Sequence, residues 1–102
     1  MSTTPIRALV VDDDASARRR LRELAGTVHD LAVIDECADG REAVEALSAN
    51  HVDLVFLDVE MPRLDGFGVI SEIGPDRMPP IIFTSAYSEF GVRARLPAQA
   101  VR

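Results

Sequence analysis

The sequence predicts an α/β fold in which a parallel β-sheet is covered by helices on both faces. Four short apolar segments are separated by stretches with helical periodicity, so strand and helix alternate along the chain. One of these segments, residues 54–57, shows no polar alternation, as expected of a strand buried on both faces. With right-handed crossovers, this order gives a doubly wound sheet. At 102 residues, we expect one domain over residues 1–102.

The first expected strand, residues 6–11, runs directly into the acidic residues 12–14. Apolar residues at helical spacing then predict a helix over residues 15–25, which Gly26 can end. The set expected to face inward is Ala17, Leu21, Leu24, Ala25 and Val28. The opposite face carries four arginines, which indicate a solvated helix face or, as the alternative, a docking surface for an acidic partner. These are Arg18, Arg19, Arg20 and Arg22.

A second strand is expected over residues 31–34, followed by a helix up to Asn50. Asp39 with Glu42 three residues later has the spacing of a capping box at the start of that helix. The apolar residues 54–57 form the next strand and lead into Asp58.

A third helix is expected over residues 66–73, with Phe67, Ile70 and Ile73 facing inward and Gly74 and Pro75 ending it. A fourth strand over residues 80–84 and a last helix that begins near Ser88 and ends at Pro97 complete the pattern.

The net charge of −6 argues against direct binding of nucleic acid or of an anionic membrane surface. No apolar run has the length of a membrane span, and residues 1–5 do not resemble a secretory signal, so we expect a cytoplasmic protein. The single cysteine, Cys37, is expected to be a small apolar residue at a strand end, and His29 and His51 are expected at the surface.

Three strand ends carry polar residues that the fold should bring together. Asp12, Asp13 and Asp58 follow apolar strands, and the hydroxyls of Thr84 and Ser85 follow another. The carboxyl ends of parallel strands meet at one edge of the sheet, and several carboxylates in one pocket repel each other unless a cation neutralises them. Oxygen ligands and the lack of a His or Cys set favour Mg²⁺ over Zn²⁺. Asp14 is expected to be only a helix cap.

These motifs together resemble the receiver domain of bacterial two-component response regulators. The resemblance rests on residues 11–14 (VDDD), 56–62 (FLDVEMP) with 64–66 (LDG), and 83–87 (FTSAY), and it runs from Ile6 to about Val101. It implies a flavodoxin-like sheet in the order 2-1-3-4-5. Residues 85–90 with 92–94 are most similar to receivers that precede LytTR-type DNA-binding domains.

The resemblance implies that Asp58 is the phosphoacceptor, and that a sensor histidine kinase or a phosphotransfer protein is the partner that supplies the phosphoryl group. It also implies that Asp13 binds Mg²⁺ directly and Asp12 through water, with Asp58 and the backbone carbonyl of Glu60 as further ligands. Ser85 would donate a hydrogen bond to a phosphoryl oxygen. By this resemblance the chain is a phosphoacceptor rather than an enzyme.

The chain departs from the family pattern at its C-terminal end. A fifth strand ending in Lys-Pro and a fifth helix are expected in the family, whereas this chain ends at Arg102 and contains no lysine. We therefore expect a receiver truncated before the fifth strand, with slow phosphorylation. The open edge of the fourth strand and the fourth helix are expected to form a homodimer or higher assembly.

Two other functions compete with this interpretation. A phosphorylation-independent interaction module, a degenerate receiver, fits the lack of lysine. An aspartate-dependent phosphohydrolase of the haloacid dehalogenase type would use Asp12 as nucleophile and Asp14 as general acid, but its downstream lysine and second acidic pair are missing.

Overall fold

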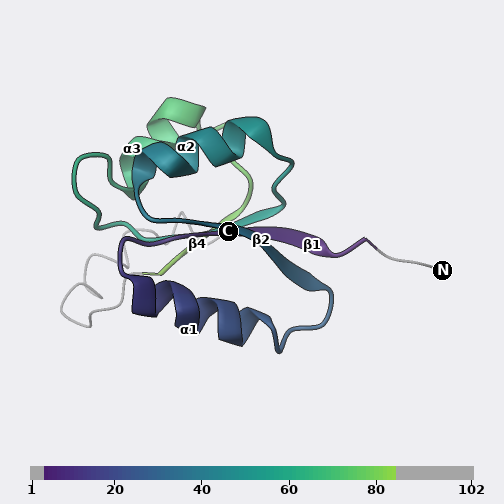
Figure 1. Cartoon of the computed structure of the whole chain (residues 1–102). Helices are drawn as coiled ribbons and strands as arrows, with labels where there is room; N and C mark the ends of the chain where they lie inside the picture. The colour runs from purple at the N-terminus through teal and green to yellow at the C-terminus, as the bar shows by residue number, and fades with distance from the viewer. Residues whose placement is uncertain (1–3, 85–102) are drawn as a thin grey trace.

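The structure, a computed structural model, describes residues 4–84 and has the predicted doubly wound architecture. Strands and helices alternate in the order β1 (Ile6–Val11), α1 (Ala15–Ala25), β2 (Leu31–Cys37), α2 (Gly40–Ala49), β3 (Leu54–Leu57), α3 (Gly66–Ile73) and β4 (Ile81–Phe83). The strands form one parallel sheet in the order β2-β1-β3-β4. Helix α1 covers one face, and α2 and α3 cover the other (Figure 1). The predicted fold and the predicted order of the first four strands are therefore confirmed.

Strand β1 lies in the middle of the sheet and is buried on both faces. Ala8, Leu9, Val10 and Val11 all have no exposed surface. Leu9 and Val11 belong to the core cluster under α2 and α3, and the residues that alternate with them point to the face where α1 lies. An apolar run without alternation thus marks the central strand, as the sequence predicts.

Strand β2 contains a bulge that the sequence does not reveal. Its pairing with β1 shifts between Ala8 and Leu9, so Ala8 pairs with Val33 but Leu9 pairs with Asp35, and Ile34 is the extra residue. After the bulge, Glu36 pairs with Val10. Glu36 therefore lies on the sheet face that α1 covers.

The helices begin where acidic residues cap them. The side chains of Asp14, Asp39 and Asp65 accept hydrogen bonds from backbone N–H groups in the first turns of α1, α2 and α3. The capping role predicted for Asp39 is confirmed by the bond from the Glu42 N–H (2.8 Å). The Glu42 carboxylate accepts from the Ala38 N–H, one residue before the expected Asp39 amide.

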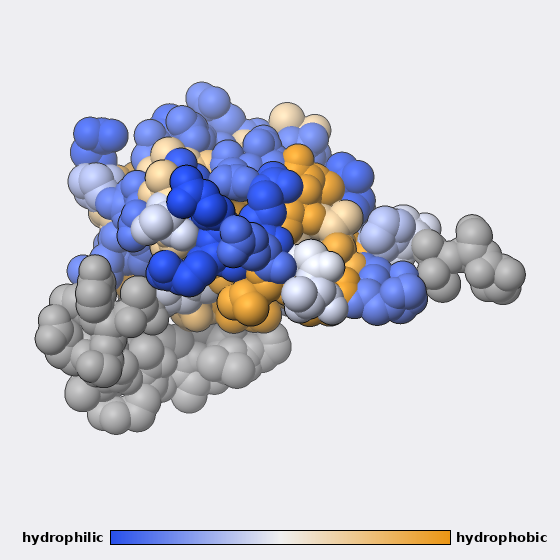
Figure 2. Space-filling view, turned by 60° about the horizontal axis from the view of Figure 1, so that its bottom comes forward, coloured by the Kyte–Doolittle hydropathy of each residue, from blue (hydrophilic) through white to orange (hydrophobic). Residues whose placement is uncertain are grey.

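Two predicted inward faces are partly wrong. On α1, Ala25 is buried but Leu24 is 62% exposed, because adjacent helical residues lie about 100° apart and cannot both face the sheet. Val28, also exposed, lies beyond the end of the helix. Figure 2 turns this side of the molecule forward and shows apolar residues at the surface beside hydrophilic ones.

On α3, the prediction that Phe67 faces inward is wrong, because Phe67 is 51% exposed while Val69 is fully buried. Two residues lie about 200° apart on a helix, so Val69 and Phe67 point in nearly opposite directions. The Phe67 ring instead packs beside Phe83 of β4, with 5.6 Å between ring centroids.

The remaining predictions concern the ends and the surface. Strand β2 is longer than predicted and β4 is shorter, and the predicted fourth helix lies outside the described residues. Cys37 is buried and both histidines are at the surface, as predicted. Among residues 4–84, none of the helices has the length and apolar character needed to cross a lipid bilayer.

Candidate functional site

Three aspartates meet at the carboxyl end of the two central strands. The Asp58 N–H donates to the carbonyl of Val11 (2.9 Å), which ties the end of β3 to the end of β1 just before Asp12. Carboxylate oxygens of Asp12, Asp13 and Asp58 all lie within 4.8 Å of one another. The predicted convergence of these residues is therefore confirmed.

Two of the three carboxylates are buried and held by backbone amides. Asp12 is 5% exposed and Asp58 is 8% exposed, whereas Asp13 lies at the surface. One carboxylate oxygen of Asp12 accepts from the Asp14 N–H (2.9 Å), and one of Asp58 accepts from the Glu60 N–H (3.2 Å). Each bond reaches an amide two residues further on, a turn geometry that aspartate favours.

Burial and mutual repulsion raise the pKa of the buried pair. Burial, followed by the charges of Asp12 and Asp13, raises the pKa of Asp58 from 3.8 to about 7. Burial also raises the pKa of Asp12, together with the charges of Asp13 and Asp14, while a bond from the Asp14 amide lowers it. Oxygen ligands that repel one another in a small volume fit a hard divalent cation such as Mg²⁺.

The other polar residues predicted near the three aspartates are Asp14, Thr84 and Ser85. Asp14 is exposed and its carboxylate caps α1 by accepting from the N–H and the hydroxyl of Ser16, as predicted for a helix cap. The Thr84 N–H donates to the Leu57 carbonyl (3.1 Å), so β4 ends beside the site. Within residues 4–84, the buried Thr84 hydroxyl has no hydrogen-bond partner. Ser85 lies outside the described residues.

Gly66 keeps the loop after β3 close to Asp58, a role that the sequence reasoning missed. A Cβ atom at Gly66 would lie 2.7 Å from the Asp58 carbonyl oxygen and 3.1 Å from the Val59 Cα. The Gly66 N–H also donates to the Val59 carbonyl (3.1 Å). Glycine directly after the capping Asp65 is the sequence signal that marks this close approach.

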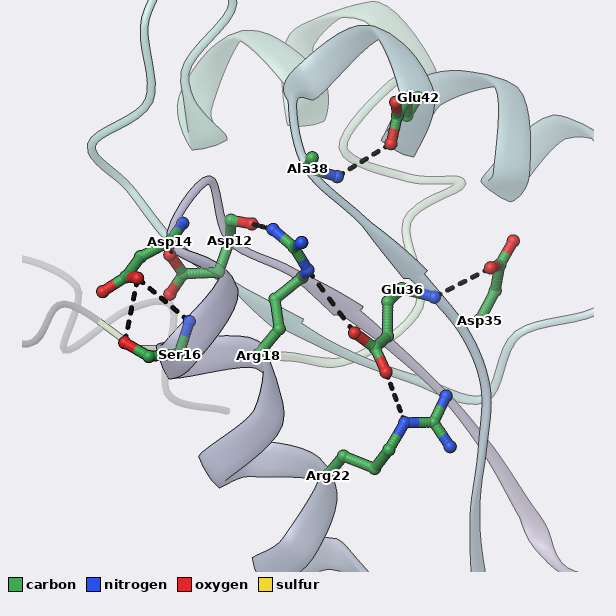
Figure 3. Close-up of polar contacts among 9 residues, drawn as sticks. All are labelled: Asp12, Asp14, Ser16, Arg18, Arg22, Asp35, Glu36, Ala38 and Glu42. Atoms are coloured by element: carbon green, nitrogen blue, oxygen red, sulfur yellow. Dashed lines mark hydrogen bonds and ion pairs between the residues drawn. The ribbon is translucent and has the colours of Figure 1, made fainter.

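The interpretation of the arginines as a solvated face is wrong for Arg18, whose side chain is only 19% exposed, whereas the side chain of Arg22 is 50% exposed. The Arg18 guanidinium donates to the backbone carbonyl of Asp12 (2.7 Å) and lies 3.4 Å from the Glu36 carboxylate. Arg22 also pairs with Glu36 (Figure 3). The bulge in β2 explains the error, because it brings Glu36 to the α1 face.

Comparison with known proteins assigns the family. The family model described as the response regulator receiver domain matches residues 8–101. The chain therefore belongs to the receiver domain family of response regulators, the phosphoacceptor domains of two-component signal transduction. Domains of this family are phosphorylated on an aspartate in a Mg²⁺-dependent reaction and are not themselves enzymes in general.

Particular relatives are proteins longer than the matched segment. The chain is 39% identical over 89 residues to an uncharacterized response regulatory protein of Yersinia pestis, covering 87% of this chain and 37% of that protein. It is 36% identical over 89 residues to the transcriptional regulatory protein BtsR of Salmonella typhi, with the same coverage. The chain thus spans a little over a third of the length of these relatives.

Solved structures agree with the fold. The response regulator domain of Thermotoga maritima CheB has a TM-score of 0.71 at 31% identity, covering 90% of this chain and 72% of that one. CheY6 of R. sphaeroides, solved in complex with the P1 domain of CheA3, has a TM-score of 0.78 at 29% identity. The match covers 96% of this chain and 78% of that one.

Proposed function

We propose that Asp58 is the phosphoacceptor of this receiver domain. The observation that carries the proposal is the position of Asp58, buried at the end of β3 with the carboxylates of Asp12 and Asp13 within 4.8 Å. A carboxylate that must attack phosphorus needs to be ionised and aimed, and the Glu60 N–H bond aims it.

The residues that would hold Mg²⁺ are Asp12, Asp13, Asp58 and the backbone carbonyl of Glu60. Bound there, Mg²⁺ would neutralise charge on the carboxylates and on the phosphoryl oxygens. Asp13 is the exposed member and is open to direct coordination, while Asp12 is the buried member. Asp58 has a pKa of about 7 without metal, so cation binding would favour its ionised form.

In the proposed step, a carboxylate oxygen of Asp58 attacks the phosphorus atom of a phosphohistidine. The new O–P bond forms as the N–P bond breaks, and the imidazole nitrogen keeps the electron pair of the broken bond. Ser85 would donate a hydrogen bond to a phosphoryl oxygen. The donor would be a sensor histidine kinase or a phosphotransfer protein, as the complex of CheY6 with the P1 domain of CheA3 suggests for a similar chain.

We further propose that residues 1–102 act as the receiver part of a cytoplasmic transcriptional regulator of the LytTR-associated type. The named relatives that are transcriptional regulatory proteins support this, and so does the segment over residues 85–94. Dimerisation through β4 belongs to the same proposal, since Ile82 on β4 is 47% exposed. Light scattering that shows a monodisperse monomer, with slow hydrogen exchange in residues 81–83, would contradict the dimer.

The test of the phosphoacceptor is incorporation of one phosphoryl group from a small phosphodonor with millimolar Mg²⁺, followed by mass spectrometry. We expect acid-stable, base-labile label in the wild type, none in Asp58→Asn, and unchanged label in the matched variant Asp14→Asn, whose carboxylate only caps α1. Label that persists in Asp58→Asn would remove Asp58 from the role and would favour Asp12 as nucleophile.

The test of the cation ligands is a Mg²⁺ titration of two neighbouring variants. Asp13→Ala should weaken binding far more than Asp14→Ala, because Asp13 belongs to the cluster and Asp14 does not. Equal losses of Mg²⁺ affinity in the two variants would mean that Asp12 and Asp13 are not the acidic pair that binds the cation.

A further inference from the structure

Asp12 is held at three polar groups by three different parts of the chain. Its N–H donates to the Cys37 carbonyl of β2 (3.0 Å), and its carboxylate accepts from the Asp14 N–H (2.9 Å). Its backbone carbonyl accepts from the guanidinium of Arg18 on α1 (2.7 Å). Of these three bonds, only the one from Arg18 comes from a side chain. Arg18 is therefore the one partner among these three whose bond to Asp12 can be removed by substituting a side chain.

Arg18 is itself fixed by a carboxylate on the edge strand. Its side chain is only 19% exposed, and its Nε lies 3.4 Å from a carboxylate oxygen of Glu36, which is 29% exposed. Glu36 also pairs with Arg22, and hydrogen bonds and charge from Arg22 and Arg18 lower the pKa of Glu36. Figure 3 shows the chain of contacts from Arg22 through Glu36 and Arg18 to Asp12. A planar guanidinium suits this arrangement, since its several N–H groups point to two acceptors at once.

We propose that Arg18 is a positioning residue of the acidic site: anchored by Glu36, it fixes the backbone of Asp12 and so keeps that carboxylate aligned with Asp13 and Asp58. The bond reaches the carbonyl of Asp12 and not its carboxylate, so Arg18 leaves the carboxylate oxygens available to a cation. Strand β1 ends at Val11, so Arg18 stabilises the backbone of Asp12, the first residue after the strand. This inference rests on the proposed function, because alignment matters only if the cluster binds a cation.

Partners one step removed from the metal ligands commonly control metal affinity by orienting those ligands. The pair of Arg18 and Arg22 gives a matched comparison on one helix. Both contact Glu36, but only Arg18 also contacts Asp12. Loss of either removes an ion pair between α1 and β2, and only loss of Arg18 frees the Asp12 carbonyl.

The experiment compares Arg18→Met with Arg22→Met by calorimetric titration with Mg²⁺ alone. We expect affinity to fall by about tenfold in Arg18→Met, the usual size of such effects, and to stay close to wild type in Arg22→Met. Arg18→Lys should recover part of the affinity, since an ammonium can reach one acceptor but lacks the planar set of N–H donors that reaches two at once. Equal affinities in Arg18→Met and Arg22→Met would overturn the proposal.

A second measurement separates this inference from the proposed function. The amide of Asp14 donates to the Asp12 carboxylate, so its NMR shift and exchange rate report the position of Asp12 without any metal or phosphoryl group. In metal-free protein, Arg18→Met should shift this amide and speed its exchange, and Arg22→Met should leave it unchanged. If the wild type bound no Mg²⁺, the proposed function would fail while this amide still decided the role of Arg18. An Asp14 amide unaffected by Arg18→Met would overturn that role.

Urea unfolding checks that each variant is folded. If Arg18→Met does not fold, Glu36→Gln takes its place, because it removes the anchor of Arg18 and keeps the guanidinium. We then expect Glu36→Gln to weaken Mg²⁺ binding more than Arg22→Met does. Equal binding in these two variants would overturn the proposal.

Discussion

Strand β3 has an aspartate directly before its first residue and another directly after its last, and the two are held in opposite ways. Asp53, at the amino end, accepts from the Arg7 N–H (2.9 Å) and lies 2.7 Å from the His51 imidazole. The hydrogen bond from the Arg7 amide, together with the charge of His51, lowers the pKa of Asp53 although burial opposes the shift. Asp58, at the carboxyl end, has its pKa raised to about 7 by burial and by other carboxylates.

The two ends of β3 therefore place the same residue type in opposite electrostatic surroundings. Asp53 connects the starts of β1 and β3, and the Arg7 guanidinium adds a bond to the His51 carbonyl (2.8 Å). At the other end, the same residue type is placed where its ionised form is unfavourable, and perturbed carboxylates of this kind mark functional sites. The fold thus carries an energetic cost at one end of β3 that a bound cation would relieve.

The largest expected effect is on the pH dependence of stability without metal. Between about pH 4 and 7, Asp58 is ionised in the unfolded chain but holds its proton in the folded one, so the free energy of unfolding should fall as pH rises. A rise in pKa from 3.8 to about 7 corresponds to about 4 kcal/mol. Urea unfolding at several pH values, in the presence of a metal chelator, measures this decrease in the free energy of unfolding. Mg²⁺ should reduce it, and Asp53→Asn should preserve it. A free energy that stays constant over this range would contradict the raised pKa.

A smaller effect should have opposite signs at the two ends of β3. At pH 8 without metal, Asp58→Asn removes a buried charge that faces other carboxylates, and we expect it to stabilise the fold by about 2 kcal/mol. Asp53→Asn should destabilise the fold, because the Arg7 amide and His51 lose a charged partner. Urea unfolding of the two variants under one set of conditions provides the comparison. Destabilisation by both would mean that Asp58 is as well satisfied as Asp53.

The smallest expected effect tests how closely the loop approaches Asp58. Gly66→Ala would place a methyl group 2.7 Å from the Asp58 carbonyl, and we expect a loss of between about 1 and 2 kcal/mol with slower labelling of Asp58. Gly26→Ala is the matched control, since its Cβ would meet backbone atoms only at 3.4 Å and beyond. The two variants are compared by urea unfolding and by phosphoryl incorporation. Equal stability of the two would show that the loop can move away from Asp58 at no cost.

Much of the site could be predicted from local pattern. Apolar runs that end in acid placed Asp12, Asp13 and Asp58 together, because the carboxyl ends of parallel strands share an edge. The helix over residues 66–73 was predicted with its observed bounds, since Asp65 caps it and Gly74 ends it. In each case the signal lies within a few residues of its effect.

The features that escaped prediction depend on pairing between distant segments. Arg18 has the same local pattern as Arg19 and Arg20, and only the position of Glu36 on the next strand distinguishes it. The exposure of Phe67 follows from how α3 sits over the edge of the sheet, where Phe83 is its neighbour. Sequence periodicity gives the apolar side of a helix but not which part of that side the sheet covers.

The bulge at Ile34 divides β2 into two halves that are each in phase with β1. Val33 before it and Asp35 after it occupy consecutive places along the ladder, although they are two residues apart in the chain. Ile34 is therefore the one place in β2 where a residue can be removed while its neighbours keep their partners and their faces. A deletion after this point would instead carry Glu36 away from Arg18 and Cys37 out of the core. The length of β2 is therefore constrained more strictly after the bulge than at it.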